Sequence, residues 1–427
     1  MNPHSPYRVT IDGAEATVHT VQDASYVLLS SDKIMQVEVA TTIPFRTVKV
    51  RPLSVGIAPV VEGNRIRFEV KAPAKLSIEL DGSLRSPLFL LANPPETFRP
   101  SPDDVGVRYY AKRDEPYDAG EIVLGSGETL YIEEGARVYG RVSAYRADDV
   151  KVAGRGILDG SLWRLEGAKP YSERTQRIRF IECSRVSIEG ITVVDGENWH
   201  IVPIACNEVR ISDVNVITFE GTGDGIDVVG CKDVRIEGCF IRSNDDCIAV
   251  KGNDYFHPSG CADVERVRVE RCVLWNAPWG NAIEIGYETR CEHIRDIVFE
   301  DIDIIHCEFE GWQSGGTFTI HNGDRATVSD VFYRRIRVED SREKLVDIKI
   351  QHSVYSKDER RGLVINIRFE DIDVVDGPFP VSIIRGFDGD HLIENVAFER
   401  LTVHGEPILS ANQARMVVEL AKNVSFS

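Results

Sequence analysis

The feature that most constrains the fold is a short phrase that recurs along the chain: an alternating apolar and polar strand, a polar pair, and a second strand. Early copies begin at Val186, Val209 and Val234, so successive copies lie 23 and 25 residues apart (209 − 186 and 234 − 209). Later copies begin at Val267, Ile297, Ile367 and Val396, with longer spacings. A period in the low twenties that tolerates insertions is typical of a solenoid whose coils stack strand on strand.

The residue types in the repeat decide between two kinds of solenoid. Leucine-rich repeats have a similar period, but their Leu/Asn signature is absent here, and β-branched residues stand where helices would be expected. We therefore predict an all-β chain in which residues 120–427 form a right-handed parallel β-helix. The insertions between copies are then loops that project from single coils.

The first part of the chain has a different pattern. Short alternating segments at 7–11, 66–70 and 76–80 are separated by turn residues such as Asp81-Gly82. This pattern predicts a small antiparallel β-sandwich over residues 1–97. Four prolines between residues 93 and 102 indicate a connector, and we place a linker at 98–119.

Charge and hydropathy exclude several classes of partner. The net charge is −18, and there is no long Lys/Arg cluster, so nucleic acid is not an expected partner. The same acidic balance is a poor match for a long polyanionic substrate. No apolar run reaches the roughly 18 to 20 residues needed to cross a bilayer, so we expect no membrane contact.

Cysteine usage and the first residues bear on the compartment. The nine cysteines form no CxxC pair, so a zinc site of the usual spacing is not expected. Most of them lie among Ile and Val residues, which favours small, buried, reduced core side chains. The first residues show neither a basic n-region nor an apolar h-region, and together these features predict a cytoplasmic protein.

Three aspartates are spaced by about one coil. Asp245 and Asp246 follow Asp224 by 21 and 22 residues (245 − 224 and 246 − 224), and neighbouring coils lie about 4.8 Å apart. Carboxylates gathered in this way cannot all be comfortably ionised. One protonated acid beside ionised partners suits cleavage of a glycosidic bond. A site for a hard cation such as Ca²⁺, or a merely solvated turn, would give the same spacing.

Several motifs resemble those of a known family. Residues 223–228 (GDGIDV) and 243–251 (SNDDCIAVK) resemble the NTDGID and DDCIAIK motifs of the polygalacturonase family, glycoside hydrolase family 28. Residues 154–160 (GRGILDG) with Trp163, and 198–203 (NWHIVP), are similar to two further motifs of that family. The likeness covers about residues 120–405. The N-terminal part, with 50–53 (VRPL) and 90–94 (LLANP), resembles the sandwich that precedes the β-helix in family 49 dextranases.

The resemblance implies a role for each aspartate. Asp245 would be the general acid, while Asp224 and Asp246 would hold and activate the attacking water, with inversion at the anomeric carbon. The substrate would be an oligosaccharide or polysaccharide with an α-glycosidic bond. The resemblance implies no cofactor, neither metal nor organic.

Two departures from the family pattern bear on the substrate. Asn281 stands where the family has a histidine, and the local spacing of 33 residues (267 − 234) predicts that it lies near position 248, at the border of the cleft. Thr319 and His321 stand where the family has the Arg and Lys that hold the substrate carboxylate. Without that cationic clamp a uronate loses its charge-assisted partners. A neutral sugar, or an oligosaccharide with an uncommon residue, is therefore expected in place of plain polygalacturonate.

Other residues are candidates for substrate contact, and each has a plainer interpretation. Glu284 and Glu288 fit cleft lining or solvent exposure equally well, and Trp199, Trp279 and Trp312 fit sugar stacking or packing between loops. The list of candidates also includes Lys251 and His200, although His200 is more simply a hydrogen-bonded structural residue. The aromatic insertion at 252–258, which contains His257, would overhang one end of the groove and favour exo-action.

Two other functional classes stay open at this point. Many polysaccharide lyases are β-helices, but they need a basic side chain that abstracts a proton and usually Ca²⁺. A non-catalytic carbohydrate-binding or adhesion β-helix would bind without turnover. Solenoids with exposed edges often assemble, so a homo-oligomer is a possible state that the sequence does not decide.

Overall fold

The computed structural model describes residues 5–163, 170, 173–252, 261–308 and 315–427. The chain divides into two compact units, Met1–Arg99 and Pro100–Ser427. Among the described residues the only helices are two single 3-10 turns, η1 (Leu53–Val55) and η2 (Ser161–Trp163). Neither of these helices is long and apolar enough to cross a membrane.

The first unit is a β-sandwich of two five-stranded sheets, with strand orders β2-β1-β5-β8-β7 and β3-β4-β10-β9-β6. Its strands are β1 (Tyr7–Ile11), β2 (Ala14–Ala16), β3 (Val18–Val21), β4 (Ala24–Ser30), β5 (Ile34–Thr41), β6 (Val48–Arg51), β7 (Val60–Glu62), β8 (Arg65–Lys71), β9 (Ala74–Leu80) and β10 (Leu88–Asn93). Strand β8 alternates exposed and buried residues along its whole length, because its apolar side chains face the other sheet. The predicted sandwich is confirmed, with one difference: β10 pairs with β4 in parallel.

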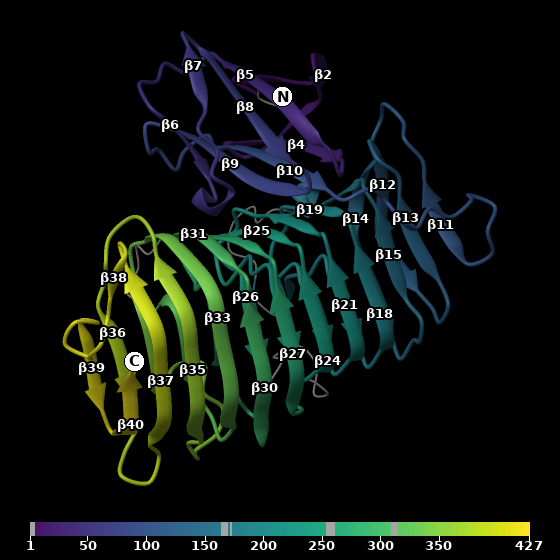
Figure 1. Cartoon of the computed structure of the whole chain (residues 1–427). Helices are drawn as coiled ribbons and strands as arrows, with labels where there is room; N and C mark the ends of the chain where they lie inside the picture. The colour runs from purple at the N-terminus through teal and green to yellow at the C-terminus, as the bar shows by residue number, and fades with distance from the viewer. Residues whose placement is uncertain (1–4, 164–169, 171–172, 253–260, 309–314) are drawn as a thin grey trace. The chain divides into compact units, whose positions relative to one another are not determined.

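The second unit is the predicted right-handed parallel β-helix (Figure 1). Its described strands are β11 (Val107–Tyr110), β12 (Tyr117–Leu124), β13 (Thr129–Ile132), β14 (Arg137–Tyr145), β15 (Lys151–Gly154), β16 (Ile157–Asp159), β17 (Ile178–Ile181), β18 (Ser184–Glu189), β19 (Thr192–Val194), β20 (Ile201–Ile204), β21 (Asn207–Ser212), β22 (Asn215–Ile217), β23 (Ile226–Val229), β24 (Lys232–Glu237), β25 (Phe240–Ser243), β26 (Ile248–Lys251), β27 (Val264–Glu270), β28 (Val273–Asn276), β29 (Ile283–Tyr287), β30 (His293–Glu300), β31 (Asp303–Cys307), β32 (Gly316–Asn322), β33 (Thr327–Ser341), β34 (Lys344–Ile350), β35 (Leu363–Val374), β36 (Ser382–Arg385), β37 (Ile393–Val403), β38 (Glu406–Pro407), β39 (Met416–Glu419) and β40 (Ala421–Phe426).

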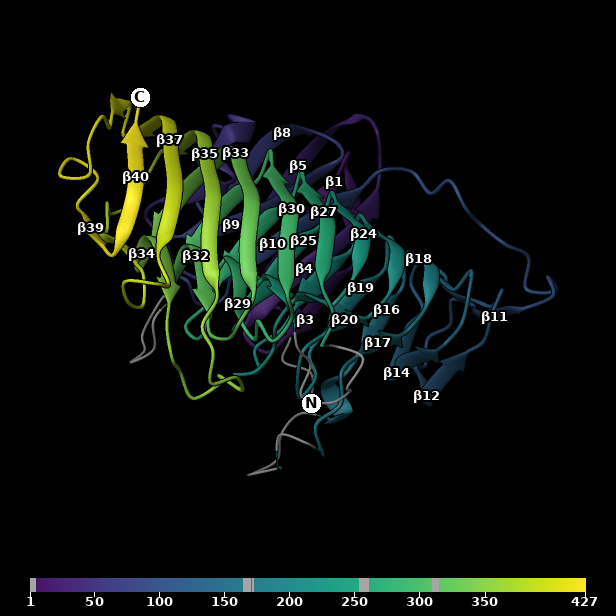
Figure 2. The ribbon, with the colours of Figure 1, turned by 90° about the horizontal axis from the view of Figure 1, so that it is seen from below.

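The repeated phrase sets the register of the coils. Val209 pairs with Val234 and Val234 with Val267, so each copy of the phrase lies directly on the previous one. Figure 2 shows the strands that carry these copies side by side along the solenoid. Strand β11 lies inside the predicted linker at 98–119 and pairs in parallel with β13. The linker prediction is therefore wrong at its C-terminal end, because the prolines that suggested it end at residue 102 and alternating residues follow.

The two faces of the repeated strand have different roles. Its apolar positions build one continuous core that contains a stack of aromatic rings from successive coils: Phe299, Tyr333, Phe369, Phe398 and Phe426. The centroids of neighbouring rings lie 4.7 to 5.1 Å apart. The rings lie within about 12° of parallel, a geometry in which dispersion contacts add to the burial of apolar area.

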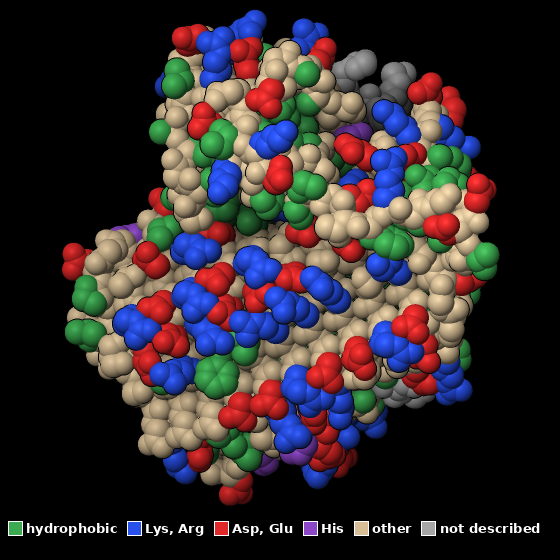
Figure 3. Space-filling view, turned by 45° about the vertical axis from the view of Figure 1, so that its right-hand side comes forward, with side chains coloured by type: hydrophobic (Ala, Val, Ile, Leu, Met, Phe, Trp, Pro, Cys, Tyr) green, Lys and Arg blue, Asp and Glu red, His purple; other side chains and the backbone are tan. Residues whose placement is uncertain are grey.

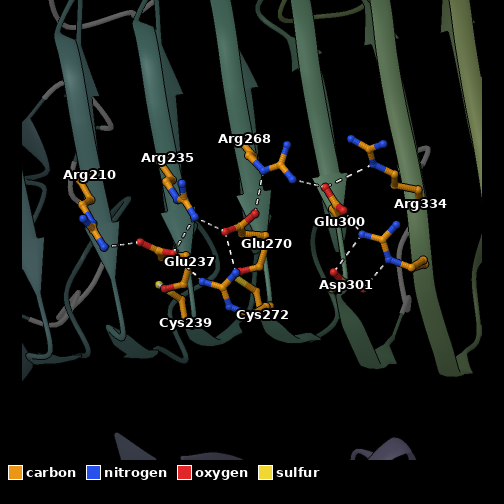
Figure 4. A network of polar contacts seen from close by, with 12 residues as sticks. Arg210, Arg235, Glu237, Cys239, Arg268, Glu270, Cys272, Glu300, Asp301 and Arg334 are labelled. Carbon is orange, nitrogen blue, oxygen red and sulfur yellow. Dashed lines mark hydrogen bonds and ion pairs between the residues drawn. The ribbon is translucent and has the colours of Figure 1, made fainter. Parts of the chain in front are cut away.

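The polar positions of the same strand form a ladder of ion pairs on the outside. Figure 4 shows arginines and glutamates alternating across β21, β24, β27, β30 and β33. The contacts include Arg210–Glu237 at 2.7 Å and Arg334–Glu300 at 3.3 Å. Figure 3 shows basic and acidic side chains gathered side by side over the β-helix. The arginines of these pairs are partly exposed, whereas Glu237, Glu270 and Glu300 are buried, so the ladder supplies buried carboxylates with counter-charges.

Candidate active site

The parallel register brings the three predicted aspartates together. Ile226 on β23 pairs with Ile248 on β26, and Ile248 pairs with Ile283 on β29. Asp224 and Asp246 lie two positions before Ile226 and Ile248, so they are also neighbours. One carboxylate oxygen from each of Asp224, Asp245 and Asp246 lies within 4.8 Å of the others. The 22-residue spacing that suggested this neighbourhood is thus the length of one coil.

A turn before β26 directs Asp245 and Asp246 to the same side. The hydroxyl of Ser243 and the amide of Asn276 each donate a hydrogen bond of 2.8 Å to the backbone carbonyl of Asp245. These bonds hold the chain out of the regular strand conformation, in which adjacent side chains would face opposite ways.

Gly280 on the next coil makes this close packing possible. A Cβ atom at Gly280 would lie 2.4 Å from both the carbonyl carbon of Asp245 and the backbone nitrogen of Asp246. We expect Gly280→Ala to push the two aspartates out of place and to lower kcat about 100-fold, the loss typical of a 1 Å misplacement. The measurement is steady-state kinetics beside a thermal melt. Gly389→Ala, where a Cβ meets nothing within 4 Å, is the control, and equal activity of the two variants would contradict the expectation.

A cavity of about 380 Å³ contains the aspartates. Of the predicted site residues, Asp224, Asp245, Asp246, Trp199, Lys251, Trp279, Asn281 and Glu288 line it. The lining also includes Gly221, Thr222, Tyr287, Val354, Tyr355 and Lys357, which the sequence did not single out. Glu288 is buried at 6% exposure and lines the cavity, so its alternative interpretation as a solvent-exposed residue is wrong. Trp279 is 46% exposed, which suits a ring that meets a ligand.

Asp224 is buried and contacts a cation. Its Oδ2 lies 3.0 Å from the ammonium group of Lys251. Burial raises the pKa of Asp224, the neighbouring Asp227 raises it further, and Lys251 opposes both effects. The net effect is a raised pKa, which the direct contact with the ammonium group keeps lower than burial and Asp227 alone would make it.

Asp246 has hydrogen-bond donors in addition to the Lys251 ammonium group, which lies 4.0 Å from its Oδ2. Its Oδ1 accepts hydrogen bonds from the backbone nitrogen of Asn281 at 2.9 Å and from the side-chain amide of Asn281 at 2.7 Å. Burial and the charge of Asp245 raise the pKa of Asp246, while the Asn281 donors lower it. Asn281 therefore lies beside residue 246 and not beside 248 as predicted, because the local coil step is 35 residues (283 − 248) and not 33.

Asp245 is the most accessible of the three acids. It is half-buried, whereas Asp224 and Asp246 are buried. Burial raises the pKa of Asp245 to about 7, with Lys251 acting in the opposite direction. The pKa of all three acids is therefore raised, and their contacts distinguish them: Asp224 and Asp246 have a cationic or hydrogen-bonding partner for the ionised form, whereas Asp245 is the accessible acid, with a pKa of about 7.

Three predicted contact residues lie in the cavity wall instead of lining the cavity. Glu284, Thr319 and His321 are fully buried, and the carboxylate of Glu284 accepts hydrogen bonds from the Thr319 hydroxyl and, at 2.9 Å, from Nδ1 of His321. Nε2 of His321 lies 3.3 Å from Asp347. Burial lowers the pKa of His321, but the two carboxylates outweigh it and raise the value to about 9. Direct contact with a substrate is therefore the wrong assignment for these three residues.

His200 is also a wall residue. It is fully buried, and Nδ1 of its ring lies 3.0 Å from the backbone carbonyl of Asp224. Burial lowers the pKa of His200 to about 4, so the ring is neutral at physiological pH. The simpler of the two interpretations, a hydrogen-bonded structural residue, matches this geometry. Trp312, His257 and most of the insertion at 252–258 lie outside the described residues.

Asp227, and Tyr287 among the lining residues named above, are two residues of the site that sequence reasoning missed. Asp227 lies 3.0 Å from the Lys251 ammonium group, and the Tyr287 ring lies on the imidazole of His321 with centroids 4.4 Å apart. Strand alternation accounts for Asp227, because the core-facing residues of β23 are Ile226 and Val228, so Asp227 must face outward. It does not account for Tyr287, since Ile283 and Ile285 face the core on β29 and alternation would place residue 287 on the same side. The signal in the sequence was therefore the position of Asp227 between two core-facing residues of one strand, three residues after Asp224.

The three aspartates are also the residues that could hold a hard cation, since they offer several carboxylate oxygens in a small space. Lys251 already supplies a positive charge at 3.0 Å from Asp224. A divalent ion bound to that oxygen would have to displace the ammonium group. The donor set thus fits proton transfer better than metal binding.

A parallel β-helix with acids clustered in a cavity beside its strand ends has the side chains that cleavage of a glycosidic bond by paired carboxylates requires. The sequence profile of "Glycosyl hydrolases family 28" matches residues 122–383, more than half of the chain. The chain belongs to this family.

Known proteins similar to the chain agree with this placement. The chain is 28% identical over 196 residues to a probable polygalacturonase of Vitis vinifera, a match that covers 44% of the chain and 38% of that protein. It is 24% identical over 271 residues to probable rhamnogalacturonase C of Aspergillus niger, with 62% and 46% covered. The chain thus spans less than half the length of either relative. Among solved structures, Dex49A from Penicillium minioluteum has a TM-score of 0.56 at 14% identity, with 99% of this chain and 93% of that chain covered, and so shares the fold.

Proposed function

We propose that the protein is an inverting glycoside hydrolase that cleaves an α-glycosidic bond at the end of an oligosaccharide or polysaccharide. The observation that carries the proposal is the division of the acid cluster. Asp224 and Asp246 have partners that stabilise their charge, and Asp245, beside them, is half-buried in the cavity with its pKa raised to about 7.

The chemistry requires both halves of this division. Asp245 would donate its proton to the leaving glycosidic oxygen, because it is the accessible acid of the three and its pKa is raised to about 7. Asp224 and Asp246 would bind one water between them and remove its proton as the water attacks the anomeric carbon. Asp245 would end as a carboxylate, and the proton taken from the water would restore it.

The stereochemistry is the most direct test. Carboxyl groups in inverting enzymes are about 6.5 to 9.5 Å apart, and in retaining enzymes about 5 to 5.5 Å. The single carboxylate oxygens of the three aspartates lie within 4.8 Å of one another, which is closer to the range of retaining enzymes. Two ionised acids beside one protonated acid nevertheless suit a bound water, as inversion requires. NMR of the first product formed from a panel of α-linked oligosaccharides should show the inverted anomer. A retained anomer would assign one of the carboxylates as a nucleophile instead.

The charges of the cavity support a neutral sugar at the reacting subsite in place of plain polygalacturonate. Four acidic residues, Asp224, Asp245, Asp246 and Glu288, and two lysines line the cavity. Lys251 is in contact with two aspartates, and His321, at the family's clamp position, lies between two carboxylates. Neither Lys251 nor His321 therefore has a positive charge left over for a uronate. The relatives are named for polymers of uronates, so the panel must include galacturonate and rhamnogalacturonan oligomers, and fast cleavage of the former would refute this part.

The size of the cavity supports exo-action. At about 380 Å³ it is at the small end of ligand pockets, which run from roughly 300 to 1,000 Å³, so it suits a chain end better than an extended polymer. Release of single units or short pieces from the end of a labelled oligosaccharide is expected. Random internal cutting would contradict it.

The pH dependence follows from the acid. Because Asp245 must be protonated to act and its pKa is raised to about 7, we expect kcat/KM to fall about tenfold per pH unit above about pH 7. On the acidic side the rate should fall as the base cluster takes up protons. The measurement is kcat/KM across pH, with a thermal melt at each pH as control. A rate that stays constant to about pH 9 would exclude Asp245 as the acid.

For the compartment, we propose the cytoplasm. The support is the burial of eight of the nine cysteines, all with free thiols, within the described structure. Labelling of the native protein with a thiol reagent should modify Cys261, the exposed one, before any other.

A further inference from the structure

Lys251 has a densely charged surrounding. Its side chain is 4% exposed, and its ammonium group lies 3.0 Å from both Asp224 and Asp227. The carboxylates of Asp246 and Glu288 are each 4.0 Å away. On a further side the ammonium group lies 3.7 Å from the ring centroid of Trp199.

The strand register explains how this arrangement forms. Ile248 and Val250 face the core, so Ala249 and Lys251 face outward on β26. Ala249 is paired with Asp227 on the preceding coil, and its small side chain leaves space through which the lysine reaches back toward Asp227 and Asp224. The ring face of Trp199 attracts the ammonium group electrostatically and keeps it next to the two aspartates.

We propose that Lys251 is a positioning residue that keeps Asp224 ionised for its role as base, with Asp227 as the counter-charge that tunes it, and that Lys251 does not recognise the substrate. This inference rests on the proposed hydrolase function. Asp224 is the one acid of the cluster with an ammonium group within hydrogen-bond distance among the described contacts. Two carboxylates in contact with one ammonium group leave no net positive charge for an anionic sugar.

Charges on every neighbouring element act on the contact between Lys251 and Asp224. Asp224 and Asp227 come from the β23 coil, Asp245 and Asp246 from the turn before β26, and Glu284 and Glu288 from β29 and its C-terminal end. His200, on the preceding coil, is neutral, and its ring contacts the backbone carbonyl of Asp224. Lys251 opposes the effect of burial on Asp224, and Asp227 adds to it. Removal of one or the other should therefore shift the titration of Asp224 in opposite directions.

The test is a cycle of three variants read through the pH dependence of kcat/KM. In Lys251→Met the acidic limb should move up by about 1 pH unit or more, and kcat below the new limb should fall about tenfold or more. In Asp227→Asn the limb should move down, and in the double variant it should lie between the two. KM should change less than about threefold in all of them, since no substrate contact is lost. Opposite shifts are a result that a merely structural role would not produce.

Lys357→Met is the matched control, because it removes the other lysine that lines the cavity. It should change KM more than the position of the acidic limb. The inference is overturned if Lys251→Met raises KM and leaves the limb in place, or if Asp227→Asn and Lys251→Met shift it in the same direction. Should Lys251→Met fail to fold, Lys251→Arg and Asp227→Asn provide the same comparison, with a smaller shift for the arginine.

A second measurement separates this inference from the proposed function. NMR of ¹³C-labelled aspartate carboxyls follows the titration of the cluster without any substrate. Wild-type protein that cleaves nothing in the panel would refute the hydrolase, and the NMR titration would still show whether Lys251 and Asp227 act on Asp224 with opposite signs. Titrations that do not differ among the variants would refute the role of Lys251 in an active enzyme.

Discussion

Asp245→Asn should lower kcat about a thousandfold or more while the protein stays folded. The amide has almost the same shape as the carboxyl group and Asp245 is half-buried, so little packing is lost. The leaving oxygen, however, would no longer receive a proton, because an amide is not an acid at this pH. The measurement is release of sugar from the best α-linked substrate of the panel, beside a thermal melt.

Two comparisons make this result specific to proton donation. An aryl glycoside with an acidic phenol as leaving group needs little protonation, so Asp245→Asn should cleave it with a much smaller loss. Asp233→Asn is the matched control, since Asp233 is an exposed aspartate that pairs with Arg266 outside the cavity. Near-normal turnover of the natural linkage by Asp245→Asn would remove the acid role. Equal losses on both substrates would indicate a structural effect.

The core of the site could be predicted from the sequence because a β-helix converts spacing into contact. Asp224 and Asp246 lie one coil apart with no insertion between them, so a count of residues was enough to place them together. The count was two residues off for Asn281, since the step of 33 residues was taken from β24 and β27. The chain from Asn276 to Ile283 is two residues longer than that from Ser243 to Ile248, so the step at the site is 35 residues. Pairing of Ile248 with Ile283 is a fact of three-dimensional register that a neighbouring repeat does not determine.

The roles of Glu284, Thr319 and His321 could not be predicted for a different reason. Strand alternation places all three on the outward face, which is correct. Their burial depends on partners from later coils, such as Asp347 on β34, and no local pattern links residue 321 to residue 347. Tyr355 and Lys357 of the cavity come from a loop outside the repeat, so periodicity carried no information about them.

Phe369→Ala should be the most destabilising of the changes considered for the β-helix, lowering its free energy of unfolding by about 3 to 5 kcal/mol. The ring is buried between Tyr333 and Phe398, with both centroids 4.7 Å away, and Phe318 contacts it edge-on at 5.6 Å. Truncation removes these contacts and leaves a cavity that stacked strands on both sides cannot close. Urea unfolding of the full chain, followed by tryptophan fluorescence and circular dichroism, measures the loss.

Phe426→Ala is the control from the same stack, and it separates the effect of position from that of residue type. Phe426 is the last ring, half-buried, with Phe398 as its ring neighbour at 4.7 Å. Its loss should cost clearly less, because within the described structure the ring stacks on one neighbouring ring, whereas Phe369 stacks on two. In a solenoid each coil is stabilised by its two neighbours, so an interior substitution weakens two interfaces and a terminal one weakens a single interface. Equal destabilisation by the two variants would mean that the stack unfolds as one unit, and that its stability is not a sum over neighbouring coils.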